Sequence, residues 1–303
     1  MVKRLLRRFW VERQIWILVI PMLIWVFTFS YLPIYGLIIA FQNFIPGNSY
    51  LAGPWVGLDN FVRFFDIPEF GNIMRNTIAM SLLTMAFSLP GPIILALMFS
   101  ELRGRRIKKF TQTVSYIPYF ISWVVVTNIL FTFLRTEGVF NELLQSLGLT
   151  NKPILFLGEG KFYWIMIALA NLWKDVGFNT IIYLSAIAAV DSELYEAGRI
   201  DGLGRFGLVW HITLPGIRTT IVLLWILGLG GILNAGFEQH LLLGNPMTRE
   251  YYEVIDTYVY RYGVQLGNYS FGAAVGLMKS VLGVALVVLV NRLSRKILDT
   301  SIF

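Results

Sequence analysis

The chain has 303 residues, of which 56% are hydrophobic and 14% are charged, with a mean hydropathy of +0.65 and a formal net charge of +7. So few charged residues cannot solvate the surface of a globular domain of this length, which excludes a soluble protein and indicates a membrane protein. No cysteine occurs, which excludes disulfides and thiol chemistry.

Apolar stretches of about 18 residues or more predict membrane-spanning helices. Six follow one another along the chain, at 15–41, 77–100, 113–134, 162–190, 219–241 and 269–290. The alternating pattern of a transmembrane barrel does not recur. We therefore predict an all-α integral membrane bundle of six transmembrane helices.

The segment 1–14 interleaves basic residues with Leu5, Leu6, Phe9 and Trp10. This pattern predicts an amphipathic helix that lies at the cytoplasmic surface of the membrane before the first span. The segment also imitates a signal peptide. Because the apolar run after it is too long and no small-residue cleavage site closes it, we expect it to be retained.

Lysines and arginines are distributed unevenly between the apolar stretches. If the N-terminus is cytoplasmic, 16 of them lie in cytoplasmic segments and 7 in outer loops. This bias predicts that both termini are cytoplasmic, and it accounts for most of the net charge without nucleic-acid binding. The predicted divisions are a cytoplasmic N-terminal segment at 1–14, an added first helix at 15–41, an extracytoplasmic loop at 42–75, a five-helix core at 76–291 and a cytoplasmic tail at 292–303.

The polar insert at 191–216, between the fourth and fifth apolar stretches, has the pattern of folded structure. Residues 193–199 contain no helix breaker, Gly202 interrupts the pattern, and a helical pattern resumes over 206–212 before Pro215. The insert is therefore predicted to form two short helices joined by a glycine bend.

Ionisable residues occur within the apolar stretches, with Lys174 and Asp175 in the fourth, Glu238 near the outer end of the fifth and Lys279 in the sixth. Charges at membrane depth cost roughly 2.5–3.5 kcal/mol each on insertion scales, so they face a partner or a water-filled path. Helical spacing places four residues on one stripe, Asn171, Lys174, Asp175 and Phe178. This stripe suits a sugar path, and the alternative, that the lysines pair with carboxylates to hold the bundle together, stays open.

No set of residues indicates catalysis. The two histidines, His211 and His240, are predicted to lie on opposite sides of the membrane, so they cannot form a paired metal site within one chain. The stretch 158–161 lacks the earlier glycine and the hydroxyl residue of a phosphate-binding loop. We predict that the chain is not an enzyme and does not hydrolyse ATP by itself.

The insert resembles the EAA signature of the permease subunits of binding-protein-dependent ABC importers. That signature is Glu-Ala-Ala, three residues, Gly, nine residues, Ile, one residue and Leu-Pro. The residues at the matching positions are Glu196, Ala197, Gly202, Ile212, Leu214 and Pro215, with Gly198 in place of the second alanine. Segments 31–36, 233–239 and 258–261 are similar to the polysaccharide-type, LplB-like sugar permeases. The resemblance therefore runs from about residue 16 to the end.

The resemblance implies a MetI-like permease of a type I ABC importer in the cell membrane, in which the last five helices form the core. Its implied partners are a second homologous permease, two ATPase subunits that carry ATP and Mg, an extracytoplasmic solute-binding protein and membrane lipid. No cofactor is expected on this chain. In this arrangement Glu196 contacts the ATPase, Gly202 permits the bend, and Leu214-Pro215 fixes the return to the fifth helix.

The resemblance further implies uptake of carbohydrate, as oligosaccharide or polysaccharide fragments, by alternating access. Maltose-type relatives hold sugar midway through the membrane, and the matching positions here are the stripe at 171–178, joined by Asn234 and Glu238 near the following helix. Lys174 and Asp175 suggest a charged sugar, such as one that contains uronic acid. The alternatives are an ABC importer of glycerol phosphate, polyamine or peptide, a secondary transporter, or a membrane scaffold protein.

Overall fold

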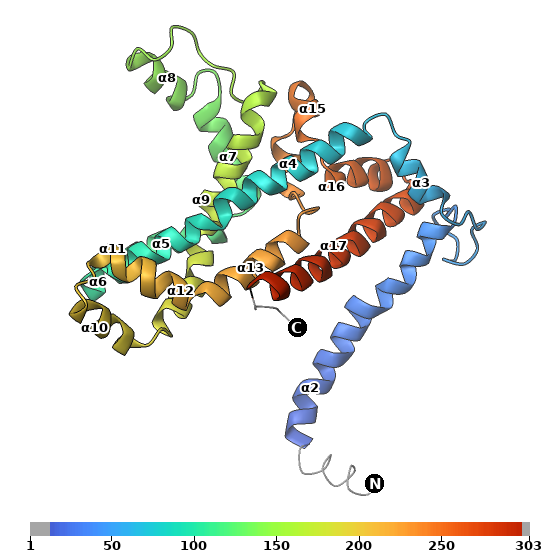
Figure 1. Ribbon diagram of the computed structural model, residues 1–303. Coiled ribbons are helices and arrows are strands. Elements are labelled where there is room, and N and C mark those ends of the chain that lie inside the picture. The colour runs from blue at the N-terminus through green and yellow to red at the C-terminus, as the bar shows by residue number, and fades with distance from the viewer. Residues whose placement is uncertain (1–12, 299–303) are drawn as a thin grey trace, which may run out of the picture. The chain divides into compact units, whose positions relative to one another are not determined.

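A computed structural model describes residues 13–298 (Figure 1). The predicted interfacial helix at 1–14 therefore lies almost wholly outside the described residues, as does the end of the predicted tail. Within the described part the chain is helical, and the only extended pairing is an isolated bridge between Gln42 and Trp55. Its contacts divide the chain into two compact units, Met1–Ile67 with Val259–Met278 and Pro68–Tyr258 with Lys279–Phe303.

The first unit contains the N-terminal apolar helix. Its elements are α2 (Arg13–Val26), the π-helical η1 (Phe27–Tyr31), the 3₁₀-helical η2 (Leu32–Phe41), α3 (Asp59–Phe65), the π-helical η6 (Val259–Gln265) and the start of α17 (Tyr269–Leu298). No residue of α2 is buried, so its apolar side chains are available to lipid. The Asn60 amide holds the end of η2 by donating to the carbonyls of Ala40 and Gln42, both at 2.9 Å.

The second unit contains most of the remaining helices and the rest of α17. Its other elements are α4 (Phe70–Ser88), α5 (Pro90–Glu101), α6 (Arg105–Tyr116), η3 (Ile117–Phe120), α7 (Trp123–Leu134), α8 (Val139–Ser146), α9 (Gly160–Ala188), α10 (Ser192–Ile200), α11 (Arg205–Leu208), η4 (Val209–Thr213), α12 (Leu214–Gly216), α13 (Arg218–Gly230), α14 (Glu238–Leu243), η5 (Pro246–Thr248), α15 (Arg249–Tyr252) and α16 (Ile255–Tyr258).

Helix α9 is the centre of the second unit and packs against α4, α5 and α6. Its 29 residues extend about 43 Å, which exceeds the hydrocarbon thickness of a bilayer. Close packing depends on glycine, because a Cβ on Gly91 of α5 would lie 2.6 Å from Leu172, and one on Gly177 of α9 would lie 1.8 Å from the carbonyl oxygen of Ser115. Only hydrogen at these positions lets the helices cross at this distance.

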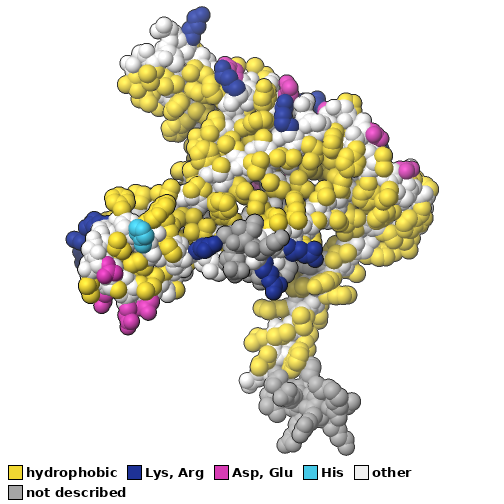
Figure 2. Space-filling model, viewed as in Figure 1, with side chains coloured by type: hydrophobic (Ala, Val, Ile, Leu, Met, Phe, Trp, Pro, Cys, Tyr) yellow, Lys and Arg dark blue, Asp and Glu magenta, His cyan; other side chains and the backbone are white. Residues whose placement is uncertain are grey.

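The elements of the second unit separate into two ends. Helices α10 to α12 gather at the C-terminal end of α9, and α15 packs beside its N-terminal end (Figure 1). Charged side chains cluster around α10 and α11, whereas hydrophobic side chains cover the part between the ends (Figure 2). This distribution is the one that a membrane-crossing bundle requires.

Two predicted spans are interrupted. The third, 113–134, is broken after η3, where Pro118 lacks a backbone donor and Ser122 starts α7 as an N-cap that accepts from the Val125 N–H. The predicted extent of the fifth, 219–241, is wrong, because α13 ends at Gly230 in a glycine-rich stretch where helix is disfavoured.

Five helices of the described part are long and apolar enough to cross a membrane. A sixth span is counted if the segments Arg205–Gly216 and Arg218–Gly230, bent by 60°, form one broken span. The predicted fold class, an all-α membrane bundle, is confirmed. The orientation of the termini and the domain boundaries stay predictions.

Candidate functional site

The insert at 191–216 forms the predicted pair of short helices with a glycine bend. Asp191 begins α10 as an N-cap whose carboxylate accepts from the backbone N–H of Glu193 at 2.9 Å. Gly202 has a φ of +84°, in the left-handed region that side chains with a Cβ disfavour. The bend therefore depends on glycine at this position, and the second helix follows as α11 and η4.

The departure from the EAA signature at Gly198 has a packing reason. Gly198 is buried, and a Cβ there would lie 2.8 Å from Ile212, 2.9 Å from Leu208 and 3.2 Å from Leu203. An alanine would push these side-chain ends apart. Glycine instead lets α10 lie close against η4, so the two short helices form one packed knob.

The knob carries an exposed carboxylate and several exposed apolar side chains. Glu196 is exposed on α10, and the exposed fractions of Ile200, Phe206 and Trp210 are 87%, 92% and 70%. We call these four residues the coupling surface. Exposed apolar groups of this size at a polar end of the protein mark a contact with a partner. The sequence analysis predicted Glu196 but not the three apolar residues, whose only signal was their large apolar side chains within a polar insert.

The remaining EAA positions fix the knob to the bundle. Leu214 packs against a buried cluster that includes Ala96, Tyr183 and Ile217. Pro215 lies in α12, which continues the helical segment of α11 and η4 and ends at Gly216, just before the 60° bend to α13. Ile212 faces Gly198, and Ala197 is exposed on α10. These positions thus divide between surface contact and internal packing.

A polar pocket lies between α4, α9 and the stretch that follows α13. Its volume is about 190 Å³. The polar side chains that line it are Ser81, Thr84, Ser88, Asn171, Asn234 and Gln239. The amide of Gln239 donates to the Asn171 side-chain oxygen at 3.4 Å, and the Asn171 amide donates to the Thr84 hydroxyl at 3.5 Å. These long, weak contacts leave the amides available to another partner.

Two further features suit this pocket to a hydroxyl-rich ligand. The Ser81 hydroxyl is buried and has no hydrogen-bond partner among the described residues, although buried polar groups are almost always satisfied. Gly236, with a φ of +97°, lies so close to Gln239 that a Cβ would displace the amide. Thr84, Ser81 and Gln239 were missed from the sequence.

The stripe predicted on α9 faces two different neighbours. Asn171 lines the polar pocket, whereas the Lys174 ammonium donates to the carbonyl oxygen of Tyr119 at 2.6 Å and lies 5.2 Å from the centre of the Tyr119 ring. Phe178 stacks on the same ring, with centroids 3.9 Å apart. The half-buried Asp175 is not among the residues that line the pocket. The contacts described for Lys174 are thus with a backbone carbonyl and an aromatic ring, whereas the alternative stated from the sequence was a pair with a carboxylate.

The other polar residues predicted near the path also separate. Asn234 lines the polar pocket, whereas Glu238 is exposed at the start of α14 and does not line it. Lys279 forms an ion pair with Asp256, both within the second unit and both largely buried. This pair joins α16 to α17 and offsets the cost of a charge at membrane depth. The path assignment of the predicted residues stays a prediction.

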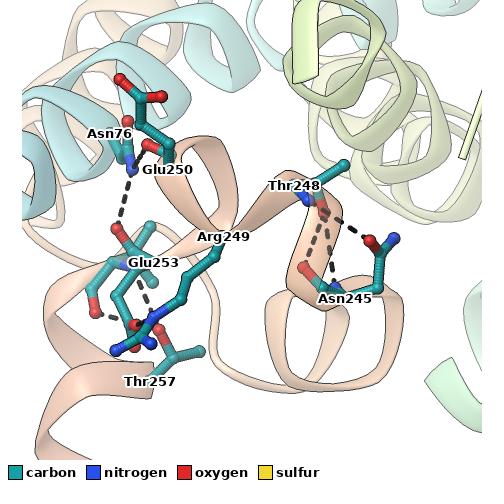
Figure 3. Close-up of polar contacts among 8 residues, drawn as sticks. Asn76, Asn245, Thr248, Arg249, Glu250, Glu253 and Thr257 are labelled. Carbon is teal, nitrogen blue, oxygen red and sulfur yellow. Dashed lines mark hydrogen bonds and ion pairs between the residues drawn. The ribbon is translucent and has the colours of Figure 1, made fainter. Parts of the chain in front are cut away.

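The loop that carries α15 and α16 is held against α4 by a polar cluster (Figure 3). The buried Asn76 amide donates to the backbone oxygens of Glu250 and Glu253, at 2.8 and 3.0 Å. Arg249 pairs with Glu253 at 3.5 Å, beside a pocket of about 400 Å³ that Glu69, Glu250 and Glu253 also line. This rim is predominantly acidic. The sequence analysis did not predict this pocket, because its lining comes from two segments that are far apart in the chain.

His240, in α14, is fully buried. Its Nε2 donates to the carbonyl of Ala235 at 3.2 Å, so its Nδ1 accepts from the hydroxyl of Tyr163 at 3.1 Å. Burial lowers the pKa of His240 to about 4. The side chain is therefore neutral and links α14 to α9.

We predict a loss of stability in mild acid that originates at His240. In the unfolded chain His240 binds a proton below its ordinary pKa of about 6.5, whereas in the folded chain it stays neutral down to about pH 4. The free energy of unfolding therefore falls as the pH drops from 6.5 towards 4. Between pH 7.5 and 5 this linkage is worth about 2 kcal/mol. In thermal unfolding of the purified protein, His240→Gln should lower the Tm at pH 7.5 and lose less of it on acidification than the wild type. An equal acid-induced loss in both proteins would contradict the assignment.

A bundle of membrane-crossing helices with a polar pocket in its interior and a packed knob at one end defines a multi-pass membrane transport protein. The profile of the family described as binding-protein-dependent transport system inner membrane component matches residues 88–299. The chain belongs to this family of permease components, which confirms the family predicted from the EAA positions.

Similar proteins cover nearly the whole chain. Protein LplB of Bacillus subtilis (strain 168) is 42% identical over 293 residues, 96% of this chain and 92% of its own. The polygalacturonan/rhamnogalacturonan transport system permease protein YteP of the same organism is 41% identical over 302 residues, 99% of this chain and 94% of its own. These similarities agree with ABC-type permeases and not with a secondary transporter.

Solved structures give the same result. A chain in the crystal structure of a bacterial ABC transporter involved in the import of the acidic polysaccharide alginate is 36% identical, with a TM-score of 0.87 over 97% of this chain and 99% of that chain. A second structure, of the bacterial alginate ABC transporter in complex with an alginate pentasaccharide-bound periplasmic protein, gives 36% identity and a TM-score of 0.88 over 99% of this chain and 100% of that chain.

Proposed function

We propose that this chain is a permease subunit of an importer that takes up acidic oligosaccharides by alternating access, with both termini in the cytoplasm. The names of YteP and of the alginate transporter support a polysaccharide-derived substrate and, for alginate, an acidic one. The observation that carries the proposal is the polar pocket beside Asn171, where amides and hydroxyls from α4, α9 and the stretch after α13 come together.

The pocket suits the neutral groups of a sugar. Its polar lining consists of hydroxyls and amides, which can both donate to and accept from sugar hydroxyls. Its volume of about 190 Å³ is below the roughly 300–1,000 Å³ typical of small-molecule sites. We therefore propose that it is one half of a path, completed by a second homologous permease. The acidic character of the sugar is not matched by a cation in this lining.

The coupling surface would contact the ATPase subunits and transmit their movement to the membrane helices. Two partner ATPase subunits, which carry the ATP and Mg, would each hold one such knob, with Ile200 and Phe206 in an apolar groove and Glu196 in a polar contact. Because α10 follows α9 directly, closure of the ATPases would move the helix that carries Asn171. Such a contact differs between inward-open and outward-open states and so shifts the balance between them.

The opposite end of the unit would receive the solute-binding protein. The acidic pocket beside Arg249 is bounded by α15 and the start of α4, and Asn76 holds its loop rigidly (Figure 3). A rigid, charged, concave rim suits a complementary basic projection of a partner. The alginate transporter structure, which contains a periplasmic protein, supports a partner of this kind.

The test is ATPase activity of the complete complex in lipid nanodiscs, with the binding protein loaded with acidic or neutral oligosaccharides. Stimulation by an acidic oligosaccharide is expected. Stimulation only by a non-carbohydrate solute, such as glycerol phosphate, a polyamine or a peptide, would replace the substrate while keeping the permease assignment.

Replacing Asn171 by leucine should reduce transport of the sugar. One neutral hydrogen bond is worth about 0.5–1.5 kcal/mol, so uptake at limiting sugar should fall about 2- to 10-fold. Asn128→Leu is the matched control, because its exposed amide donates to the carbonyl of Val124 on its own helix. Uptake into proteoliposomes that falls equally in both variants would remove Asn171 from the path.

A further inference from the structure

A groove lined only by hydrophobic residues runs between α7 and α9. Its volume is about 380 Å³. Phe140 and Phe156, from the segment between the two helices, cover one end, and Trp173 of α9 lies at the other. Leu169 and Trp173 are 48% and 45% exposed, so the groove opens sideways to whatever surrounds the bundle. Neither the polar pocket nor the coupling surface uses it.

The length of the groove matches one leaflet of a bilayer. Along α9 its lining extends from Phe162 to Trp173, a rise of about 16 Å. Along α7 it extends back from Leu134, the last residue of that helix, to Val126. The hydrocarbon core of a bilayer is about 30 Å thick, so a groove of this length that starts at the membrane surface would reach about the midplane.

The surface end of the groove has the residues that occur at headgroup level. The ring of Phe156 lies 5.5 Å from that of Phe140 and 5.2 Å from that of Phe162. Arg135 follows Leu134 directly and is exposed. Lys161 precedes Phe162 and forms an ion pair with Glu159 at 2.5 Å. Aromatic and basic side chains are enriched at this depth, where they contact phosphate groups.

We propose that this groove binds one acyl chain of a phospholipid from the leaflet in which α7 ends and α9 begins, with the phosphate beside Arg135. An acyl chain is narrow enough to enter. Since lipid tails are as apolar as the lining, retention comes from close packing and from the phosphate contact. The proposal is independent of the transported solute.

The test is native mass spectrometry of the complete complex after delipidation in detergent and incubation with a defined phospholipid. One retained phospholipid per copy of this chain is expected. Ala170→Leu, which fills the groove from the α9 side, should lower this occupancy at least fivefold. Ile182→Phe adds bulk on the same helix outside the groove, at a 46% exposed position, and should leave it unchanged.

Two variants of Arg135 test the proposed contact with the lipid phosphate. Arg135→Gln should lower the occupancy about threefold, and Arg135→Lys should restore most of it. Retention of detergent or free fatty acid alone, or equal occupancy in Ala170→Leu and Ile182→Phe, would overturn the proposal. So would a cross-link from Leu169→Cys to the second permease, because it would assign the groove to that subunit; the chain has no native cysteine to confuse the result.

Discussion

Glu196→Lys is expected to leave the protein inserted in the membrane at its normal level and to abolish ATP-driven uptake. Glu196 is exposed on α10, and the change reverses the one charge among the four residues of the coupling surface. Truncation of one partner of an interfacial charged contact costs about 2–5 kcal/mol, and reversal of its charge adds repulsion. The ATPase subunit that co-purifies with the variant should therefore fall by more than tenfold.

Two controls separate docking from folding. Glu101→Lys makes the same change at another exposed glutamate, at the end of α5, and should retain the ATPase subunit. Phe206→Ala should weaken co-purification, whereas Phe120→Ala, at a 76% exposed position, should not. Normal uptake by Glu196→Lys would contradict the coupling assignment.

Gly177→Ala is expected to destabilise the second unit severely. The added Cβ would lie 1.8 Å from the carbonyl oxygen of Ser115, and this neighbour is backbone that cannot rotate away. Helices α6 and α9 would have to separate, at a cost of about 1–3 kcal/mol or more. The apparent Tm of the purified protein should fall by several degrees, and the fraction that elutes as aggregate in size exclusion should rise.

Gly276→Ala is the matched control for this variant. Gly276 lies inside α17, and a Cβ there would meet nothing within 4 Å. Because alanine favours helix over glycine by about 1 kcal/mol, this variant should be as stable as the wild type or more so. A Gly177→Ala protein with unchanged Tm would show that α6 and α9 do not cross this closely.

The insert could be predicted residue by residue because its determinants are local. Asp191 caps a helix, Gly202 permits a left-handed bend, and Pro215 lies one residue before the second helical segment ends at Gly216. Each of these rules involves residues only a few positions apart. The apolar members of the coupling surface were missed, because only the fold shows which side of a short helix faces outward.

The polar pocket could be predicted only in part. Helical rotation of about 100° per residue places Asn171 and Lys174 about 60° apart, which in a crowded bundle is enough to face different neighbours. The sequence could not show that Tyr119, far away in the chain, offers its carbonyl to Lys174. Thr84 gave no clear signal, since hydroxyl residues in helices commonly bond their own backbone.

Helix α9 is continuous over its 29 residues and would therefore move as one rigid rod. At its N-terminal end the Trp164 indole donates to the carbonyl of Tyr251 at 3.0 Å, which holds it to the loop at that end. At the other end only three residues separate Ala188 from the start of α10 at Ser192, too few to absorb a rotation. A tilt of about 5° displaces the far end of a 43 Å rod by about 4 Å. If the Trp164 contact holds, a small movement of α10 would displace Asn171 about a pivot at the N-terminal end of α9.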